Sequence, residues 1–164
     1  MNKIQIIVNN GAGTGSAVAV WKETKEYLQE NNIAYNAYLT RYEKHAVKLA
    51  GQICEKIPED PIYLLVVGGD GTINEVLNGI TDFDRVRLGV IPTGSGNDFA
   101  RNLGILRNTR EDLQEITACI DQEQNGEKLQ RIDLGKVSWE GCEKPRIFGI
   151  SAGAGLDAIV CKKA

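Results

Sequence analysis

The stretch VVGGDGTINEVLNGI, residues 66–80, joins an apolar run to a helical pattern through three glycines and an aspartate. The apolar run, Ile62–Val67, is typical of a strand buried on both faces of a parallel sheet. Thr72 and Glu75 have the spacing of a capping box, which predicts a helix start. The core face of that helix would comprise Ile73, Val76, Leu77 and Ile80. A strand that passes through glycines into a helix predicts a loop at the carboxyl edge of a parallel sheet, where ligands bind.

Apolar strands and amphipathic helices alternate on both sides of this stretch. The other expected strands are Ile4–Val8, Ile33–Leu39 and Leu88–Ile91. The expected helices carry apolar faces at Ala17, Val20, Trp21, Thr24, Tyr27 and Leu28, at Ala46, Leu49, Ala50, Ile53 and Ile57, at Phe99 and Leu103, and at Leu113, Ile116 and Ile120. Ser16 is placed to cap the first of these helices, and Thr40 and Glu43 have capping-box spacing before the second. The alternation predicts the α/β class, an open parallel sheet with helices on both faces.

The character of the chain changes near its end. Residues 121–128, DQEQNGEK, have the polar composition of a linker. Two further strands follow, LQRIDLGKVSW and RIFGISAGAG, joined by the turn EGCEKP. We therefore expect one domain over residues 1–125 and the first strands of an antiparallel β domain over residues 126–164.

Composition excludes several classes of protein. The chain has 164 residues, a formal net charge of −3 and a pI near 5.3, which argues against a nucleic-acid binder held by clustered cations. The four cysteines form no CxxC pair, so neither a zinc site nor a redox motif is indicated. No apolar run approaches the ~20 residues of a membrane span, and the first is too short for a signal peptide. We expect a cytoplasmic protein with reduced thiols.

Polar or glycine-rich residues follow each of the four expected strands. They are NNGAGTG at residues 9–15, Thr40, GGDGT at residues 68–72 and PTGSGND at residues 92–98. The carboxyl ends of parallel strands lie at one edge, so these loops should converge, and glycines beside helix N-termini suit a polyphosphate. Asp70 would repel phosphate unless Mg²⁺ lies between them, which predicts a magnesium-bridged nucleotide.

Each of these features also has a purely structural interpretation. GGDGT alone can be an ordinary turn, and Asp70 can simply cap the helix near Thr72. Arg101 is expected to pair with Asp98 on a helix surface, and His45 to lie on a solvated helix face. The coincidence of four loops favours function. Neither the Walker A pattern nor the dinucleotide fingerprint is present, so another kind of nucleotide site is required.

Three segments together resemble the catalytic domain of the diacylglycerol kinase family, which includes bacterial lipid kinases and sphingosine kinases. They are GGDGTINEVLNGI, GVIPTGSGNDFARNLGI and GISAGAGLDAIV, which with the sequence between them span most of the chain. GGDGT is shared with NAD kinases and 6-phosphofructokinases, whereas the SGNDFAR segment is characteristic of the lipid kinases. The resemblance implies a nucleotide domain like that of 6-phosphofructokinase and NAD kinase.

The resemblance also implies site residues. ATP would be held by Asn9, Asn10, Gly11, Ala12, Gly13, Thr40, Gly68, Gly69, Asp70, Gly71, Thr72, Ile73, Asn74 and Ser95. Asp70 would be the catalytic residue and the Mg²⁺ ligand, and its replacement by alanine should abolish activity with little loss of folding. Asn97, Asp98 and Arg101 match a motif that braces the cleft between domains. The family usually has Asn-Pro where this chain has Asn9-Asn10, which should loosen that turn.

The implied reaction is ATP-dependent phosphorylation of a lipid hydroxyl, most simply diacylglycerol to phosphatidic acid, with transient contact at a membrane surface. Family members carry a second, β-sandwich-like domain that holds the general base. Because this chain ends at Ala164, soon after GAGLDA, we expect a fragment or a truncated product, with the base beyond its end. A homodimer is compatible with this interpretation. Two alternatives stay open: a GGDGT kinase acting on NAD or a sugar phosphate, and a non-catalytic nucleotide-binding module.

Overall fold

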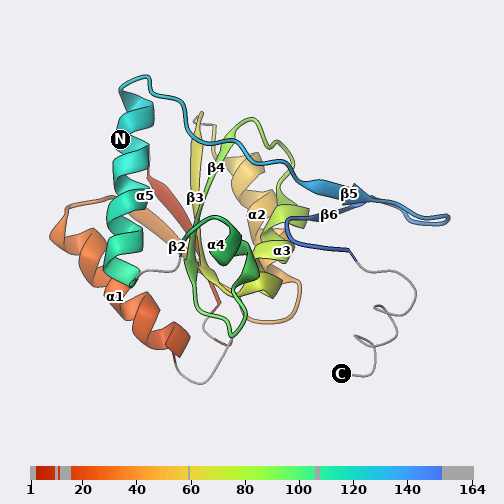
Figure 1. The fold of residues 1–164 in the computed structure, drawn as a ribbon, viewed down its shortest axis with the longest axis horizontal. Helices are drawn as coiled ribbons and strands as arrows, with labels where there is room; N and C mark the ends of the chain where they lie inside the picture. Colours follow the sequence, from red (N-terminus) through yellow and green to blue (C-terminus); the bar gives the residue numbers. More distant parts are fainter. Residues whose placement is uncertain (1–2, 10, 12–15, 59, 106–107, 153–164) are drawn as a thin grey trace.

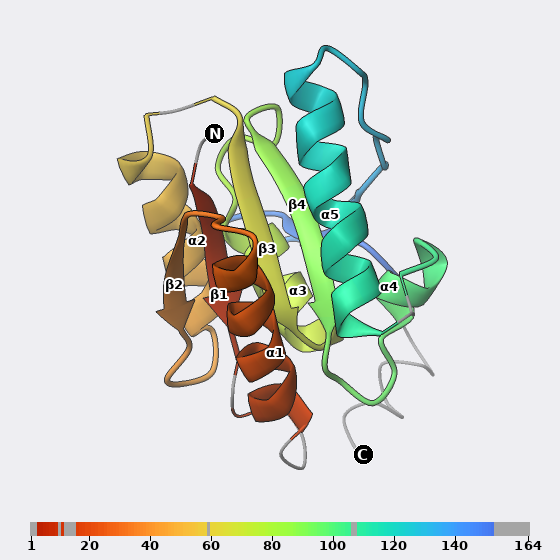
Figure 2. The same cartoon turned by 90° about the vertical axis from the view of Figure 1, so that its left-hand side faces the viewer.

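A computed structural model describes residues 3–9, 11, 16–58, 60–105 and 108–152. Its centre is a parallel sheet of four strands in the order β2-β1-β3-β4. The strands are β1 (Ile4–Val8), β2 (Tyr35–Leu39), β3 (Ile62–Gly68) and β4 (Val86–Pro92). Helices α1 (Ser16–Glu30) and α5 (Thr109–Gln124) cover one face, and α2 (His45–Lys56), α3 (Asp70–Gly79) and α4 (Asp98–Asn102) lie on the other (Figures 1 and 2). The predicted α/β class is confirmed.

The central strands are apolar on both sides because helices cover both faces. All residues of β1 and β3 are buried. Alternate residues contribute to two separate cores, with Ile6 packed toward α1 and α5 and Ile7 toward α2 and α3. Gln5 is the exception in β1: its side chain is buried and its Oε1 accepts hydrogen bonds from Asn36 and Tyr38 of β2. This polar contact holds the edge strand to the sheet.

Two helix starts differ from the prediction. The capping box expected at Thr40 and Glu43 does not form, because α2 begins at His45 after Lys44, which adopts the left-handed conformation with φ of 64°. The box expected at Thr72 and Glu75 is also wrong, since α3 already begins at Asp70. The strand expected from Ile33 starts two residues later, at Tyr35. Ser16 is the first residue of α1, and the residues before it lie outside the described ranges.

Helix α5 extends into the segment that was predicted to be a linker. Its start is capped by Asn108, whose Oδ1 accepts a hydrogen bond from the Glu111 N–H. Near its end Glu123 forms an ion pair with Arg87 of β4, so residues 121–124 stay helical. Burial raises the pKa of Tyr63 beside this pair, while a hydrogen bond to Gln124 lowers it in part.

The chain ends, within the described residues, in an antiparallel pair formed by β5 (Gly135–Val137) and β6 (Arg146–Phe148). This pair, called the hairpin below, projects away from the parallel sheet (Figure 1). The two predicted strands are thus confirmed, although they are shorter than expected. Asn78 of α3 holds the hairpin: its Nδ2 donates to the Ile147 carbonyl at 2.8 Å, and its Oδ1 accepts from the Ile147 N–H at 2.9 Å.

No helix in the described part of the chain is long and apolar enough to span a membrane.

Candidate functional site

The four strands end at one edge of the sheet, at the bottom of Figures 1 and 2. Backbone hydrogen bonds continue the parallel ladder past the strand ends and tie the first residue after a strand to the end of the neighbouring strand. The Asn9 N–H donates to the Val67 carbonyl at 2.9 Å, and the Thr93 N–H donates to the Gly68 carbonyl at 3.1 Å. The Thr40 N–H donates to the Val8 carbonyl at 2.9 Å. The four strand ends thus meet at one edge as predicted, and of the loop after β1 the structure describes Asn9 and Gly11.

A side-chain contact joins the loop after β1 to the loop after β3. Asn9 Nδ2 donates to the Thr72 hydroxyl at 2.9 Å, and Asn9 Oδ1 accepts from the Gly11 N–H at 3.0 Å. Thr72 is buried, so this hydroxyl is held in place and keeps its own proton for a further acceptor. Three other predicted nucleotide contacts, Asn10, Ala12 and Gly13, lie outside the described residues.

The loops after β3 and β4 pass each other at backbone contact. A Cβ built on Gly94 would lie 2.9 Å from the Gly69 Cα, and one built on Gly69 would lie 3.0 Å from the Gly94 Cα. Asn97 fixes the turn after β4, since it accepts from the Gly94 N–H at 2.8 Å and donates to the Gly94 carbonyl at 2.7 Å. Only glycine at both positions permits this approach.

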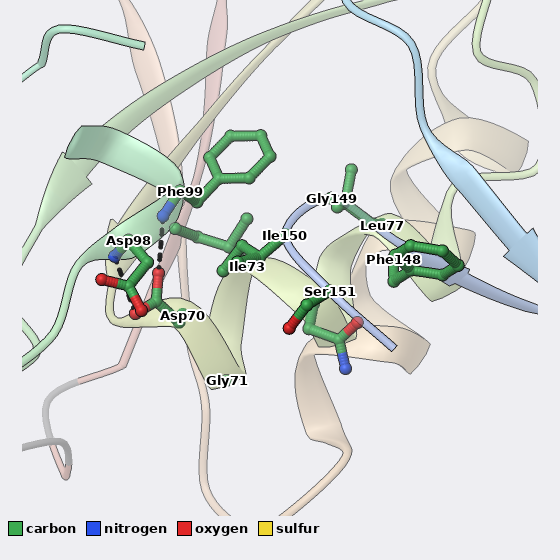
Figure 3. Close-up of a pocket in the computed structure, with 11 residues that line it drawn as sticks. Asp70, Gly71, Ile73, Leu77, Asp98, Phe99, Phe148, Gly149, Ile150 and Ser151 are labelled. Atoms are coloured by element: carbon green, nitrogen blue, oxygen red, sulfur yellow. Dashed lines mark hydrogen bonds between the residues drawn. The ribbon is translucent and has the colours of Figure 1, made fainter. Parts of the chain in front are cut away.

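Asp70 connects the same two loops through its carboxylate. Its Oδ2 accepts from the Asp98 N–H at 3.0 Å, and its Oδ1 accepts from the Phe99 N–H at 3.1 Å (Figure 3). Asp70 therefore caps α4, rather than the helix near Thr72 that contains it. The ion pair expected between Asp98 and Arg101 is present at 4.0 Å, and both side chains are exposed.

The residues around Asp70 fit a magnesium ion that is completed by phosphate. Each oxygen of Asp70 accepts one hydrogen bond and retains acceptor capacity. A Cβ built on Gly96 would lie 3.3 Å from Asp70 Oδ2 and 3.8 Å from Asp98 Oδ2, so two carboxylates flank one point. Mg²⁺ in kinases is commonly bound by one or two carboxylates plus substrate phosphates. Within the described ranges, no three acidic, histidine or cysteine side chains cluster as metal ligands.

A cavity of about 330 Å³ opens beside Asp70 and Asp98, between α3, the start of α4 and the chain after β6. Its walls combine apolar side chains with the polar groups of Asp70, Asn74, Asp98 and Ser151 (Figure 3). The lining residues are Asp70, Gly71, Ile73, Asn74, Leu77, Asp98, Phe99, Phe148, Gly149, Ile150 and Ser151. Sequence reasoning missed the part contributed by residues 148–151, because no local pattern indicates that this segment returns to α3. Phe99 and Leu77 were expected only as core residues.

The remaining predicted contacts lie at different places along the edge of the sheet at which the four strands end, which is called the rim below. Thr40 follows the edge strand β2, and Ser95 is exposed in the turn after the opposite edge strand β4. Ile73 and Asn74 line the cavity beside Asp70. His45 does not lie on a solvated helix face as expected: it is half-buried, and its Nδ1 accepts from the Arg41 N–H at 3.1 Å.

Comparison with known proteins assigns this architecture to a class. The family profile for the diacylglycerol kinase catalytic domain matches residues 3–137. The chain is 32% identical to a Bacillus subtilis (strain 168) protein named "Putative lipid kinase YtlR", across 96% of this chain and 49% of that protein. It is 41% identical over 99 residues to a diacylglycerol kinase of the same organism, which covers 57% of this chain and 30% of that enzyme.

A solved structure shares the fold. The crystal structure of a diacylglycerol kinase from Bacillus anthracis str. Sterne gives a TM-score of 0.59 at 30% identity, covering 71% of this chain and 39% of that one. The chain spans about half the length of the first of these curated relatives. The parallel α/β domain with its glycine loops is thus of the lipid-kinase type. The chain belongs to the diacylglycerol kinase catalytic domain family.

Proposed function

We propose that this chain contributes the nucleotide-binding half of an ATP-dependent lipid kinase that transfers the γ-phosphate to a lipid hydroxyl, converting diacylglycerol to phosphatidic acid. One observation carries the proposal. The Asp70 carboxylate lies at the point where the loops after β3 and β4 meet and also lines a cavity that has both apolar and polar walls. A phosphate donor on the loops and a lipid alcohol in the cavity would then meet beside Asp70.

In this proposal the loops position the donor. Phosphoryl transfer depends mainly on positioning and on stabilisation of charge. Backbone N–H groups near the starts of α1 and α3 would bind the phosphates, with the Thr72 hydroxyl as a further donor. Asp70 would hold Mg²⁺ together with the phosphates, and the ion would neutralise part of their charge. The acceptor hydroxyl would lose its proton to a general base, its oxygen would form a bond to the γ-phosphorus, and the bond from that phosphorus to the β-phosphate oxygen would break, so that ADP leaves.

The cavity supports an acceptor that has both apolar surface and a polar group. Ile73, Leu77, Phe99, Phe148 and Ile150 supply hydrocarbon surface, and Asp70, Asn74, Asp98 and Ser151 supply polar groups. Among the described residues that line the cavity there is no lysine or arginine, which a sugar phosphate would need as a partner. The part of the enzyme that binds the acceptor would begin with the segment 126–164, as the sequence suggested. A lipid acceptor would also require contact with a membrane surface during turnover.

The test is a transfer assay with labelled ATP and Mg²⁺ on the longest natural protein that contains this chain. Diacylglycerol in mixed vesicles, NAD and fructose 6-phosphate serve as competing acceptors. We expect label in phosphatidic acid only. Transfer to NAD or to the sugar phosphate would identify another GGDGT kinase, and nucleotide binding without any transfer would identify a non-catalytic module.

Variants at Asp70 separate catalysis from folding. Asp70→Asn should lower transfer at least 100-fold, an expected loss of about 2.7 kcal/mol of transition-state stabilisation. The matched control Asp121→Asn changes an exposed carboxylate on α5 and should be neutral. Asp70→Ala is a poorer test than the sequence suggested: it removes the acceptor of the Asp98 and Phe99 N–H groups and should destabilise the fold by about 1–3 kcal/mol. Full activity in Asp70→Asn would contradict the role of the carboxylate.

A further inference from the structure

An aromatic pair stands at the β2 end of the rim, where no base-binding residue was predicted. The rings of Tyr42 and His45 stack with centroids 4.3 Å apart and an interplanar angle of 24°. Tyr42 is 59% exposed, so part of its ring stays open to solvent while His45 supports it. An exposed aromatic face supported from behind is a surface on which a planar ring can stack.

The segment that carries this pair is fixed rather than free. Lys44 is held in the left-handed conformation, which a non-glycine residue adopts only when its surroundings impose it. Glu75 of α3 supplies the restraint: its carboxylate accepts from the Lys44 N–H at 2.9 Å and from the Ala46 N–H at 3.1 Å. His45 Nδ1 accepts from the Arg41 N–H, which closes the turn around Tyr42. The ring is thus held in place before any ligand arrives, which reduces the entropy lost on binding.

The position of the pair matches the length of a nucleotide. Tyr42 lies two residues after Thr40, and β2 is separated from β3 by β1 alone. Neighbouring strands are about 4.8 Å apart, so the loops after β2 and β3 are separated by roughly 10 Å. Glu75, which holds the Tyr42 turn, belongs to the helix that starts at Asp70. A base at Tyr42 and phosphates at residues 68–72 would occupy opposite ends of this span, with the phosphate end beside the cavity.

We infer that the exposed face of Tyr42, backed by His45, is the stacking surface for the purine base of the nucleotide. This inference rests on the proposed function, and it assigns to the chain a residue that binds the base and favours a purine through its larger stacking area. Arg41 and Lys44, one residue before and two residues after Tyr42 in the chain, are exposed and add positive charge to this turn. Stacking of a base on an aromatic side chain contributes enough to be measured by substitution.

The experiment is calorimetric titration of the chain with ADP, UDP and inorganic triphosphate in the presence of Mg²⁺. Loss of base stacking should weaken ADP binding by about 5-fold or more in Tyr42→Ala. Tyr42→Phe keeps the ring and should bind ADP as the unaltered chain does. Inorganic triphosphate has no base, so its affinity should be equal in all three proteins. The preference for ADP over UDP should shrink in Tyr42→Ala alone.

A matched control uses another exposed aromatic residue. Phe83 is 42% exposed and precedes β4, at the opposite edge of the sheet, so Phe83→Ala should leave ADP binding unchanged. If the unaltered chain binds ADP and Tyr42→Ala binds it equally well, the inference is overturned while the proposed function stands. A parallel loss of triphosphate binding in Tyr42→Ala would also overturn it, since the loop itself would then be disturbed. If the unaltered chain binds neither ADP nor triphosphate, the proposed function fails, and the inference fails with it.

Discussion

At the scale of single residues, Asp70 shows how one carboxylate serves both fold and site. It joins the loops after β3 and β4 by accepting two backbone hydrogen bonds, and it also lines the cavity. The two N–H groups fix the position of the carboxylate, because each of them donates to a different oxygen. The contacts that begin α4 therefore also orient the Asp70 side chain at the cavity.

Two glycines of the rim differ in how much space surrounds them, so replacing each with alanine should change stability differently. Gly94→Ala would place a Cβ 2.9 Å from the Gly69 Cα and 3.0 Å from Asn97 Oδ1, so we expect a loss of about 1–3 kcal/mol of unfolding free energy. Gly71→Ala meets nothing within 4 Å inside α3 and should be neutral or stabilising by up to about 1 kcal/mol. Urea unfolding of both variants measures the difference. Equal unfolding free energies of the two variants would show that the loops after β3 and β4 can move apart without loss of stability.

At the scale of elements, the start of α2 is stabilised by a neighbouring helix. Glu75 accepts hydrogen bonds from the N–H groups of Lys44 and Ala46, the task that Thr40 and Glu43 were expected to perform locally. Helix α2 thereby receives its cap from α3 and is tied to the loop that carries Asp70. A capping box depends on spacing along the chain, whereas this cap depends on the packing of two helices.

Alanine substitutions at Glu43 and Glu75 therefore test which residue caps α2. Glu75→Ala should lower the unfolding free energy by about 1 kcal/mol, the usual cost of losing a helix cap. Glu43→Ala changes an exposed residue that is not the cap and should stay within about 0.5 kcal/mol of the unaltered chain. Thermal or urea unfolding checks both. A larger loss of stability in Glu43→Ala than in Glu75→Ala would instead support the local capping box.

Sequence patterns predicted those elements whose signals are local. The continuous apolar runs at Ile4–Val8 and Ile62–Val67 indicated doubly covered strands, and both are buried throughout. The convergence of the loops followed from parallel strands alone. What escaped prediction depends on contacts between distant residues. Glu75 bonds to residues 29 and 31 positions away, and Asp70 bonds to residues 28 and 29 positions away.

At the scale of the whole molecule, the hairpin lies against the parallel-sheet domain through α3. The cavity exists because residues 148–151 return to that helix beside Phe99. Its lining could not be predicted, since only the fold brings the last described strand next to residues that lie about 70 positions earlier. The hydrogen bonds from Asn78 to the Ile147 backbone are the specific part of this contact.

Removal of the Asn78 side chain should release the hairpin without unfolding the sheet. In Asn78→Ala we expect the Ile147 amide to exchange with solvent about 5-fold faster or more, because its hydrogen bond is lost. Amides of β1 and β3 should exchange as before. Asn102→Ala, an exposed asparagine at the end of α4, is the matched control. Hydrogen exchange followed by mass spectrometry gives the comparison, and unchanged protection of residues 146–150 would contradict the role of Asn78.

Helix α3 carries Asp70 at one end and Asn78 near the other, eight residues and therefore about 12 Å along its axis. A helix of this length behaves as a stiff rod. A movement of the hairpin that keeps the Asn78 hydrogen bonds and tilts α3 would displace the carboxylate at the far end of the helix. The helix thus links the antiparallel pair to the point where the loops after β3 and β4 meet.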